Sequence, residues 1–438
     1  MKSVVCSAVN NMKDSGIKWL GMIPKHWDVV LVKNILRWKS VKGCGEKEVL
    51  SLYREYGVIP KSSRDDNHNV TSDNTDDYKL VEKGDFVINK MKAWQGSMGV
   101  SLYEGIISPA YYVCSFINEK VYKPYFHYLM RNSSYLPEYK RLSGGIRVGQ
   151  WDLGYDKFKS LPALLPPTLS EQRAIADWLD AKCADIDAAI ELQQRMIDKL
   201  KAYKTAVIHQ AVTKGLDKNA NLKDSGVQWI GEVPQHWEVC HLGSIFKENV
   251  RLNTEEKETN ALQFRLGEII SKSKGNSKYI PISLSGYNIV EPNVIMINGL
   301  NLSFDFISQR VALVKERGVI TSTYIAIAPS CYIEDENTTS RYACYLLKAY
   351  DTCKVLHSMG RGLRATLSYS TLSKMPILLP PLAEQRAIAD WLDAKCADID
   401  ATIALKEQKQ EKLKAYKKTI IFEYVTGKKQ VANINKQL

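Results

Sequence analysis

Several short polar clusters carry side chains that could bind nucleic acid. Residues 89–96 read Asn-Lys-Met-Lys-Ala-Trp-Gln-Gly and follow the apolar run Phe86–Ile88, which is typical of a strand. Amides and cations at a strand end are able to read base edges in the major groove, and further cations neutralise phosphates. Because most surface Lys and Asn side chains contact only solvent, this pattern identifies candidates for DNA contacts and does not establish them.

Further clusters have the same character. Residues 144–151 form a glycine-rich basic loop, with a counterpart at 360–364. The second half also carries a polar group at 298–310. We expect DNA contacts in the first half from Asn89, Lys90, Lys92, Trp94, Gln95, Ser108, Tyr111, Arg147, Gln150 and Trp151. In the second half the candidates are Asn298, Asn301, Ser303, Arg310, Thr321, Tyr324, Arg361 and Arg364.

Motifs for catalysis are missing from the sequence. It has no N-P-P-[FY] or D-P-P-Y tetrapeptide for presenting a flipped adenine and no G-x-x-x-x-G-K-[ST] phosphate loop. The fragment Glu138-Tyr139-Lys140 resembles part of a nuclease site but lacks a suitable upstream Asp. The nine cysteines include no C-x-x-C pair, which argues against a zinc site. We therefore expect a non-enzyme with no metal and no cofactor in this chain.

Composition restricts the class of protein further. The 438 residues carry a formal net charge of +12 and are 45% hydrophobic, so the chain should form two or three folded domains. A basic excess favours a phosphate-rich partner, although many proteins are mildly basic without one. No signal peptide and no apolar run of bilayer length is present. We expect a cytoplasmic protein without membrane association.

Internal repetition dominates the sequence. The segment Asp14–Trp27 returns as Asp224–Trp237 and keeps its Trp, Gly, Pro and His-Trp landmarks. The segment Glu171–Ala188 returns without a change as Glu384–Ala401. The chain therefore alternates variable and constant parts. Trp19, Trp27, Trp229 and Trp237 lie in the constant entry motif, so we interpret them as structural residues rather than base-stacking ones.

The constant parts are predicted to be long helices that pair antiparallel. Apolar residues recur there at steps of four and three, which defines a heptad seam, and Gly215 and Gly427 provide natural stops. The alternative is ordinary bundle packing inside a larger core. The seam, which could also serve partner docking, consists of Ile175, Leu179, Ile186, Ile190, Ile197, Leu200, Ile388, Leu392, Ile399, Ile403, Leu413 and Ile420.

The variable parts are predicted to be mixed α+β domains. Short β-branched or aromatic runs, such as Tyr111–Phe116 and Tyr324–Ala328, alternate with short helices such as Lys123–Arg131 and Ser340–Tyr350. The resulting fold class is α+β: two globular mixed α/β domains joined and spaced by two long antiparallel coiled-coil helices, with an internal pseudo-twofold duplication. The predicted boundaries are 1–168 and 216–381 for the two domains, 169–215 for the central helix, and 382–438 for the last helix and tail.

These residues resemble the specificity subunits of type I restriction–modification enzymes over essentially the whole chain. The resemblance rests on W-x-G-x-x-P-x-H-W, on L-P-P followed by E-Q-R-A-I-A-D-W-L-D, and on the duplication. It implies that each variable domain reads one half of a bipartite double-stranded DNA target while the helices fix the gap. It also implies docking of two adenine methyltransferase subunits and of restriction/translocase subunits, which would hold S-adenosylmethionine, ATP and Mg.

Two other functions remain open on the sequence alone. A self-contained methyltransferase or nuclease would need motifs that we do not find. A coiled-coil scaffold that does not bind DNA would explain the constant helices. It would not explain why two domains built on one plan have diverged.

Overall fold

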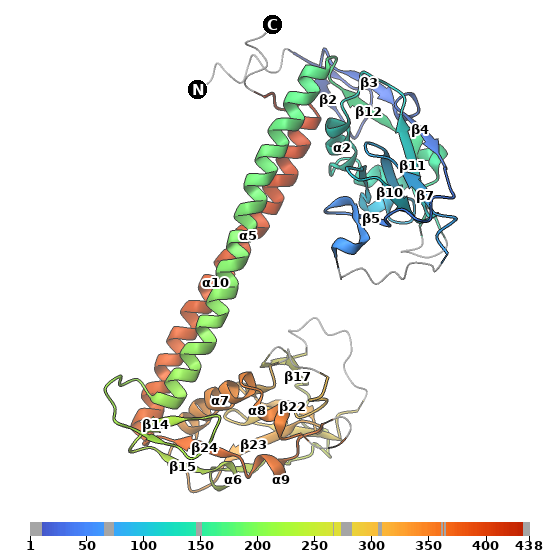
Figure 1. Ribbon diagram of the computed structural model, residues 1–438. Coiled ribbons are helices and arrows are strands. Elements are labelled where there is room, and N and C mark those ends of the chain that lie inside the picture. The colour runs from blue at the N-terminus through green and yellow to red at the C-terminus, as the bar shows by residue number, and fades with distance from the viewer. Residues whose placement is uncertain are drawn as a thin grey trace. The chain divides into compact units, whose positions relative to one another are not determined.

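The computed structural model describes residues 11–64, 74–145, 151–265, 267–272, 283–304, 309–360, 362 and 365–431. The chain divides into two compact units, shown in Figure 1. The first unit comprises residues 1–193 and 408–438, and the second unit comprises residues 194–407. Each unit therefore contains one variable domain together with half of each long helix.

The first unit is built around an antiparallel four-stranded sheet with the order β4-β11-β8-β9. Its alternating apolar residues are buried on both faces: Phe86 and Ile88 join one core cluster, whereas Val87 and Val113 join another. The strands of this unit are β1 (Met12–Asp14), β2 (Met22–Pro24), β3 (Asp28–Leu31), β4 (Leu36–Lys39), β5 (Leu50–Tyr53), β6 (Gly57–Pro60), β7 (Lys79–Val81), β8 (Phe86–Asn89), β9 (Met98–Val100), β10 (Gly105–Ile107), β11 (Tyr111–Phe116) and β12 (Pro162–Leu165). The short helices are α2 (Lys123–Arg131), α3 (Leu136–Leu142) and α4 (Tyr155–Lys159).

The second unit repeats this plan with the sheet order β16-β23-β20-β21. Its strands are β13 (Leu222–Asp224), β14 (Glu232–Pro234), β15 (Glu238–His241), β16 (Phe246–Glu248), β17 (Leu262–Arg265), β18 (Glu268–Ser271), β19 (Tyr287–Val290), β20 (Ile295–Ile297), β21 (Val311–Leu313), β22 (Gly318–Thr321), β23 (Ile325–Pro329) and β24 (Pro376–Leu379). The short helices are α6 (Leu242–Ile245), α7 (Glu336–Thr352), α8 (Val355–Ser358) and α9 (Tyr369–Leu372). The mixed α and β content predicted from the sequence is confirmed.

The two constant segments form the long helices α5 (Leu169–Lys214) and α10 (Leu382–Val425), which lie side by side within each unit (Figure 1). Thr168 caps the start of α5 by accepting a hydrogen bond from the Glu171 amide at 3.2 Å. Both helices end at a glycine with positive φ, 74° at Gly215 and 69° at Gly427. None of the helices in the described part of the chain has the length and apolarity that crossing a bilayer requires.

The helix pairing is antiparallel within each unit, as predicted. In the first unit Lys417 of α10 donates to the Asp187 carboxylate of α5 at 2.6 Å. In the second unit Lys204 of α5 donates to Asp400 of α10 at the same distance. Two apolar groups of predicted seam residues are buried between or beneath these helices. They are Ile175, Leu179, Ile186 and Ile420, with Ile190 and Leu413 partly buried, and Ile197, Ile399 and Ile403, with Leu200 partly buried.

The seam residues Ile388 and Leu392 are buried in a different place, the main core of the second unit. The start of α10 thus belongs to the packing of the globular domain as well as to the helix pair. The equivalent start of α5 behaves in the same way in the first unit, where Ile175 and Leu179 join the main core. Each long helix is therefore anchored at its start by burial against a globular domain.

Trp27 and Trp237 of the entry motifs are structural, as the sequence indicated, whereas Trp229 is 43% exposed. The Trp27 indole N–H donates to the Glu171 carboxylate at 2.9 Å, and Trp237 donates to Glu384 at 2.9 Å. A buried tyrosine adds a second attachment in each unit. Tyr125 donates to the backbone carbonyl of Val425 at 3.1 Å, and Tyr342 donates to that of Val212 at 3.3 Å. Each globular domain is thereby attached to the start of one long helix and the end of the other.

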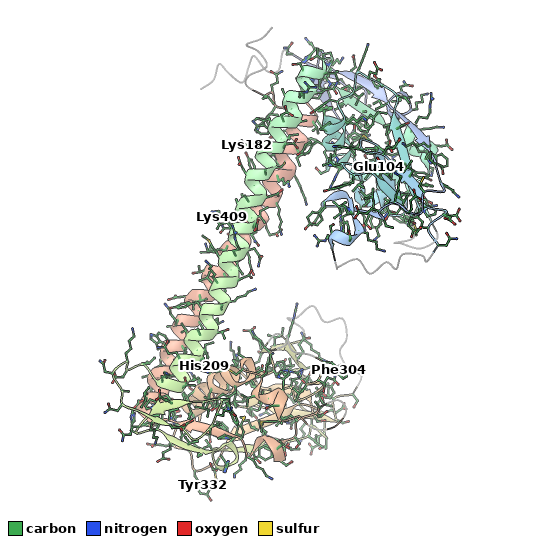
Figure 2. All side chains as sticks on the ribbon, in the orientation of Figure 1. Glu104, Lys182, His209, Phe304, Tyr332 and Lys409 are labelled. Atoms are coloured by element: carbon green, nitrogen blue, oxygen red, sulfur yellow. The ribbon has the colours of Figure 1, made fainter. Side chains whose placement is uncertain are left out.

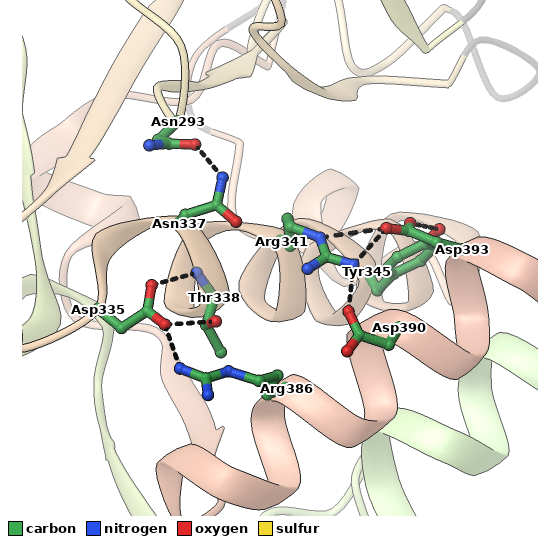
Figure 3. A network of polar contacts seen from close by, with 9 residues as sticks. All are labelled: Asn293, Asp335, Asn337, Thr338, Arg341, Tyr345, Arg386, Asp390 and Asp393. Carbon is green, nitrogen blue, oxygen red and sulfur yellow. Dashed lines mark hydrogen bonds and ion pairs between the residues drawn. The ribbon is translucent and has the colours of Figure 1, made fainter.

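A polar network in the second unit strengthens this joint (Figure 3). Arg341 of α7 contacts Asp390 and Asp393 of α10 at 2.7 and 2.5 Å. Tyr345 also donates to Asp393, at 2.6 Å. Arg386 pairs with Asp335, the residue that caps the start of α7, at 2.7 Å. These contacts hold α7 along the first turns of α10.

Candidate nucleic-acid interface

In the first unit the predicted contacts meet at one end of the central sheet. Asn89 ends β8 directly opposite Tyr111, which begins β11. Burial raises the pKa of the Tyr111 hydroxyl at this position. Lys79 lies beneath them and donates to the backbone carbonyls of Pro109 and Tyr111 at 2.8 and 2.6 Å. A buried amine thus fixes the backbone at this sheet end.

The segment after β8 forms a tight turn whose shape depends on Asn89. The Asn89 side-chain oxygen accepts hydrogen bonds from the amides of Met91 and Lys92 at 3.2 and 3.3 Å. Gly96 closes the turn with a φ of 83°, a left-handed conformation that favours glycine. Asn89 is 8% exposed, so its role is to shape the turn. Lys92 remains exposed and available to a phosphate.

The structure joins two loops that lie about sixty positions apart in the sequence. The amide of Leu153 donates to the Lys90 carbonyl at 3.0 Å, and Lys90 approaches the Asp152 carboxylate at 3.6 Å. The rings of Trp94 and Trp151 meet edge to face at 5.8 Å. Arg147 and Gln150, which were predicted in the second of these loops, lie outside the described residues.

Two other candidates of the first unit have local roles. Ser108 accepts a hydrogen bond from the Ala110 amide at 3.4 Å, in the turn before β11. Gln95 lines a cleft of about 700 Å³ between the β5–β6 turn, α2 and the helix pair. The cleft is lined by basic Arg54 and Arg131 but also by acidic Asp180 and Asp187. Its mixed charge does not favour a phosphate backbone, so Gln95 lies apart from the sheet-end cluster.

The second unit presents a similar turn after β20. The Asn298 side chain accepts from the Leu300 amide at 3.2 Å, as Asn89 does in the first unit. Asn301 adopts a φ of 53°, and Asn301 and Ser303 are exposed. Phe304, which the sequence argument did not single out, is 77% exposed and projects from the surface in Figure 2. A 92% exposed ring at Tyr332 was missed in the same way.

Arg310 requires a correction, because it is fully buried rather than presented to DNA. Its guanidinium donates to the carbonyls of Asn298 and Leu300 at 3.0 and 2.7 Å. Its backbone amide donates to the Asp351 carboxylate at 2.8 Å, and burial raises the pKa of Asp351. A guanidinium offers several donors in a fixed planar fork, so a single side chain satisfies neighbouring carbonyls. Arg310 positions the turn instead of contacting a base.

The remaining candidates of the second unit lie near the start of β23. The hydroxyls of Thr321 and Thr323 are 3.1 Å apart. Tyr324 packs its ring against Phe264 at 5.7 Å, and burial raises its pKa. Arg361 and Arg364 lie outside the described residues. Within the part of the chain that the structure describes, no three His, Cys, Asp or Glu side chains gather as a metal site would require.

Comparison with known proteins agrees with this architecture. The type I restriction modification DNA specificity domain matches the chain twice, at residues 24–202 and 234–415. The type I restriction enzyme MjaVIII specificity subunit of Methanocaldococcus jannaschii is 24% identical over 438 residues, covering 94% of this chain and 95% of that protein. The EcoBI specificity subunit of Escherichia coli is 42% identical over 62 residues, which are 14% of this chain and 13% of that protein.

A similar fold is found in a solved structure from a study of complex assembly and conformational transition of the type I R-M system. Its TM-score is 0.65 at 14% sequence identity, and the match covers 92% of this chain and 99% of that chain. At this identity the likeness concerns the fold. The two stretches matched by the domain family coincide with the two repeated halves described above.

Proposed function

Because the chain belongs to the family of type I restriction–modification specificity subunits, with two target recognition domains, we propose that each domain reads one half of a bipartite DNA sequence. The turn after β8 and the sheet end around Tyr111 contact the first half-site. The turn after β20 contacts the second half-site. The helix pair formed by α5 and α10 sets the gap between the two half-sites.

One observation carries this proposal: the two domains are attached to the long helices by the same contacts, but their sheet-end turns carry different side chains. Trp27 and Glu171 in the first unit are reproduced by Trp237 and Glu384 in the second. At the sheet ends, by contrast, the first unit presents Lys90 and Trp94 where the second presents Asn301 and Phe304 in the turn after the equivalent strand. The same attachment combined with divergent loops is expected when the two domains read different DNA sequences.

The repeated helices also support docking of two copies of an adenine methyltransferase subunit. Leu192 and Leu405 occupy equivalent repeat positions and are 44% and 66% exposed. Tyr203 and Tyr416 form a second such pair, 49% and 53% exposed. Two copies of one apolar surface suit two copies of one partner. In this proposal S-adenosylmethionine, ATP and Mg belong to the methyltransferase and restriction subunits, and this chain performs no catalysis.

Domain replacement tests the proposal. The complex with its methyltransferase is used to methylate genomic DNA, and the methylated adenines are mapped. Residues 28–160 are then replaced by the corresponding domain of a relative, and a matched chimera replaces residues 238–375. We expect each chimera to change one half of the target and to keep the other half and the gap. A change of both halves by either chimera, or methylation by the purified chain without its partner, would contradict the proposal.

A further inference from the structure

An exposed aromatic cluster lies on the sheet of the first unit and was not predicted as a DNA contact. Trp38 of β4 is 46% exposed and pairs across the sheet with Cys114 of β11. Its ring lies 5.5 Å from Tyr112 of β11 and 5.6 Å from Tyr155 of α4. Tyr112 and Tyr155 are 5.6 Å apart. Trp38, Tyr112 and Tyr155, called the aromatic triad below, thus form one contiguous aromatic surface.

The aromatic triad adjoins the candidate nucleic-acid interface at the same end of the sheet, because Tyr112 directly follows Tyr111 in β11, although the two rings pack on opposite faces. The Lys79 amine lies 5.8 Å from the Trp38 ring centroid while it donates to the Tyr111 carbonyl. Lys90 lies in the same region, because its amine is 3.6 Å from the carboxylate of Asp152, which precedes Tyr155 by three residues. Lys90 is therefore a cation near this aromatic surface that can hold a phosphate, whereas the buried Lys79 supports the Trp38 ring and the backbone beside it.

The sister domain shows that the fold does not require these rings. Register places Glu248 of β16 opposite Ile327, the counterpart of Cys114, so Glu248 stands where Trp38 stands. Ile325 occupies the position of Tyr112. Tyr369 of α9 matches Tyr155 and donates to the Phe246 carbonyl at 2.9 Å. Since the same sheet forms without Trp38 and Tyr112, the fold does not need these rings, and the exposed Trp38 beside the half-buried Tyr112 is specific to the first domain.

We propose that the aromatic triad binds a nucleobase that has left the base stack at the first half-site, with the Trp38 ring as the stacking surface. This inference rests on the proposed DNA-reading function. Stacking on an aromatic ring accepts any base, because every base has a π face. The triad would therefore strengthen binding of distorted DNA, while neighbouring polar groups such as Lys90 determine sequence.

The experiment uses the complete complex with its methyltransferase subunits and duplexes that carry the mapped target. One duplex is fully paired. A second carries an unpaired 2-aminopurine, whose fluorescence falls when it stacks on a ring, at successive positions of the first half-site. The variants are W38A and W38F, with E248A as the matched substitution in the sister domain.

We expect the wild-type complex to bind the duplex with the unpaired base more tightly and to quench its fluorescence at one position. W38A should lose that quenching and weaken binding of this duplex about tenfold. W38F should retain both within about threefold, and E248A should leave both unchanged. Equal effects of W38A on both duplexes, or a loss of discrimination between thymine and uracil in paired DNA, would overturn the stacking role. Failure of the wild-type complex to select any bipartite target would instead overturn the proposed function.

Discussion

The indole of Trp178 stacks on the ring of Tyr424, with centroids 3.9 Å apart and planes inclined by 28°. Trp391 is the same residue in the second copy of the unchanged segment, yet it is 41% exposed. The residue that corresponds to Tyr424 in α5 is Ala211, whose side chain is a single methyl group. Two identical helix segments therefore present different surfaces, because the facing helix differs.

The Y424A substitution tests the contribution of this stack to stability. It should lower the free energy of unfolding by about 1–2 kcal/mol, since it removes an aromatic pair and part of the buried area. Trp178 should become exposed, which shifts its fluorescence to longer wavelength. Chemical denaturation and emission spectra provide the measurement. Y416A, at an exposed ring on the same helix, should cost less than about 0.5 kcal/mol, and equal losses for both variants would exclude the stack as the cause.

The joint between the entry motif and α5 is tested by E171A. This change leaves the N–H of Trp27, a residue that is 2% exposed, without its acceptor. An orphaned buried donor costs about 1–3 kcal/mol of unfolding free energy. The matched E384A should cost less, because the Glu384 side chain is 40% exposed and that of Glu171 only 14%.

Thermal and denaturant unfolding of these two variants supply the comparison, with E407A as a control at an exposed glutamate of α10. If E171A unfolds like E407A, the Trp27–Glu171 hydrogen bond does not stabilise the joint.

His127 should make the first unit sensitive to mild acid. Burial, with Arg131 adding to it, lowers the pKa of His127 from 6.5 to about 3. The unfolded chain therefore takes up a proton below pH 6.5 that the folded chain refuses until about pH 3. Above pH 6.5 protonation of His127 does not reduce the free energy of unfolding. Below pH 6.5 this group lowers the free energy of unfolding by up to about 1.4 kcal/mol per pH unit.

Cys344 occupies the position of His127 in the second unit, so H127C is the matched replacement. The free energy of unfolding should depend less steeply on pH between 6.5 and 4 in H127C than in the wild type. The slopes are compared because H127C also removes the acceptor of the Val100 amide at 3.1 Å. If the free energies of unfolding of H127C and the wild type have the same slope against pH, folding does not lower the pKa of His127.

Arg310 should affect only the second half-site. R310M removes the donors that hold the carbonyls of Asn298 and Leu300, which should loosen the turn and cost about 3 kcal/mol. R310K should not restore the wild type, because an ammonium cannot reproduce the planar fork. Mapping of methylated adenines should reveal relaxed selection in one half of the target. Altered selection in the other half would refute a local positioning role.

Much of the fold could be predicted from sequence because it depends on local periodicity and repetition. The heptad spacing of residues such as Ile186 and Ile399 predicted the long helices, and the unchanged segment predicted a repeated architecture. The run Tyr111–Phe116 is the strand β11, and Lys123–Arg131 is the helix α2. In each of these segments local preference and tertiary packing agree.

The details of the candidate site depended on packing, which the sequence does not reveal. Arg310 is a residue type that often contacts DNA, yet in this fold its side chain is buried and donates hydrogen bonds to backbone carbonyls. Nothing in the sequence around Trp38 sets this residue apart from others in a strand. Its exposure and its contact with Tyr112 follow from the packing of the sheet. Comparison of Trp38 with Glu248 in the aligned repeats was the one available signal, but it required the strand pairing.

The most direct test of the central claim is a change in the length of the helix pair. Seven residues are inserted into α5 near Ile190 and into α10 near Gln410, whose side chain donates to the Ile190 carbonyl at 3.1 Å. One heptad preserves the apolar seam and adds roughly 10 Å, the length of about 3 base pairs. Mapped methylation should then occur at the same two half-sites separated by a longer gap. Retention of the original gap by a folded, active complex would show that the helices do not set the distance between the half-sites.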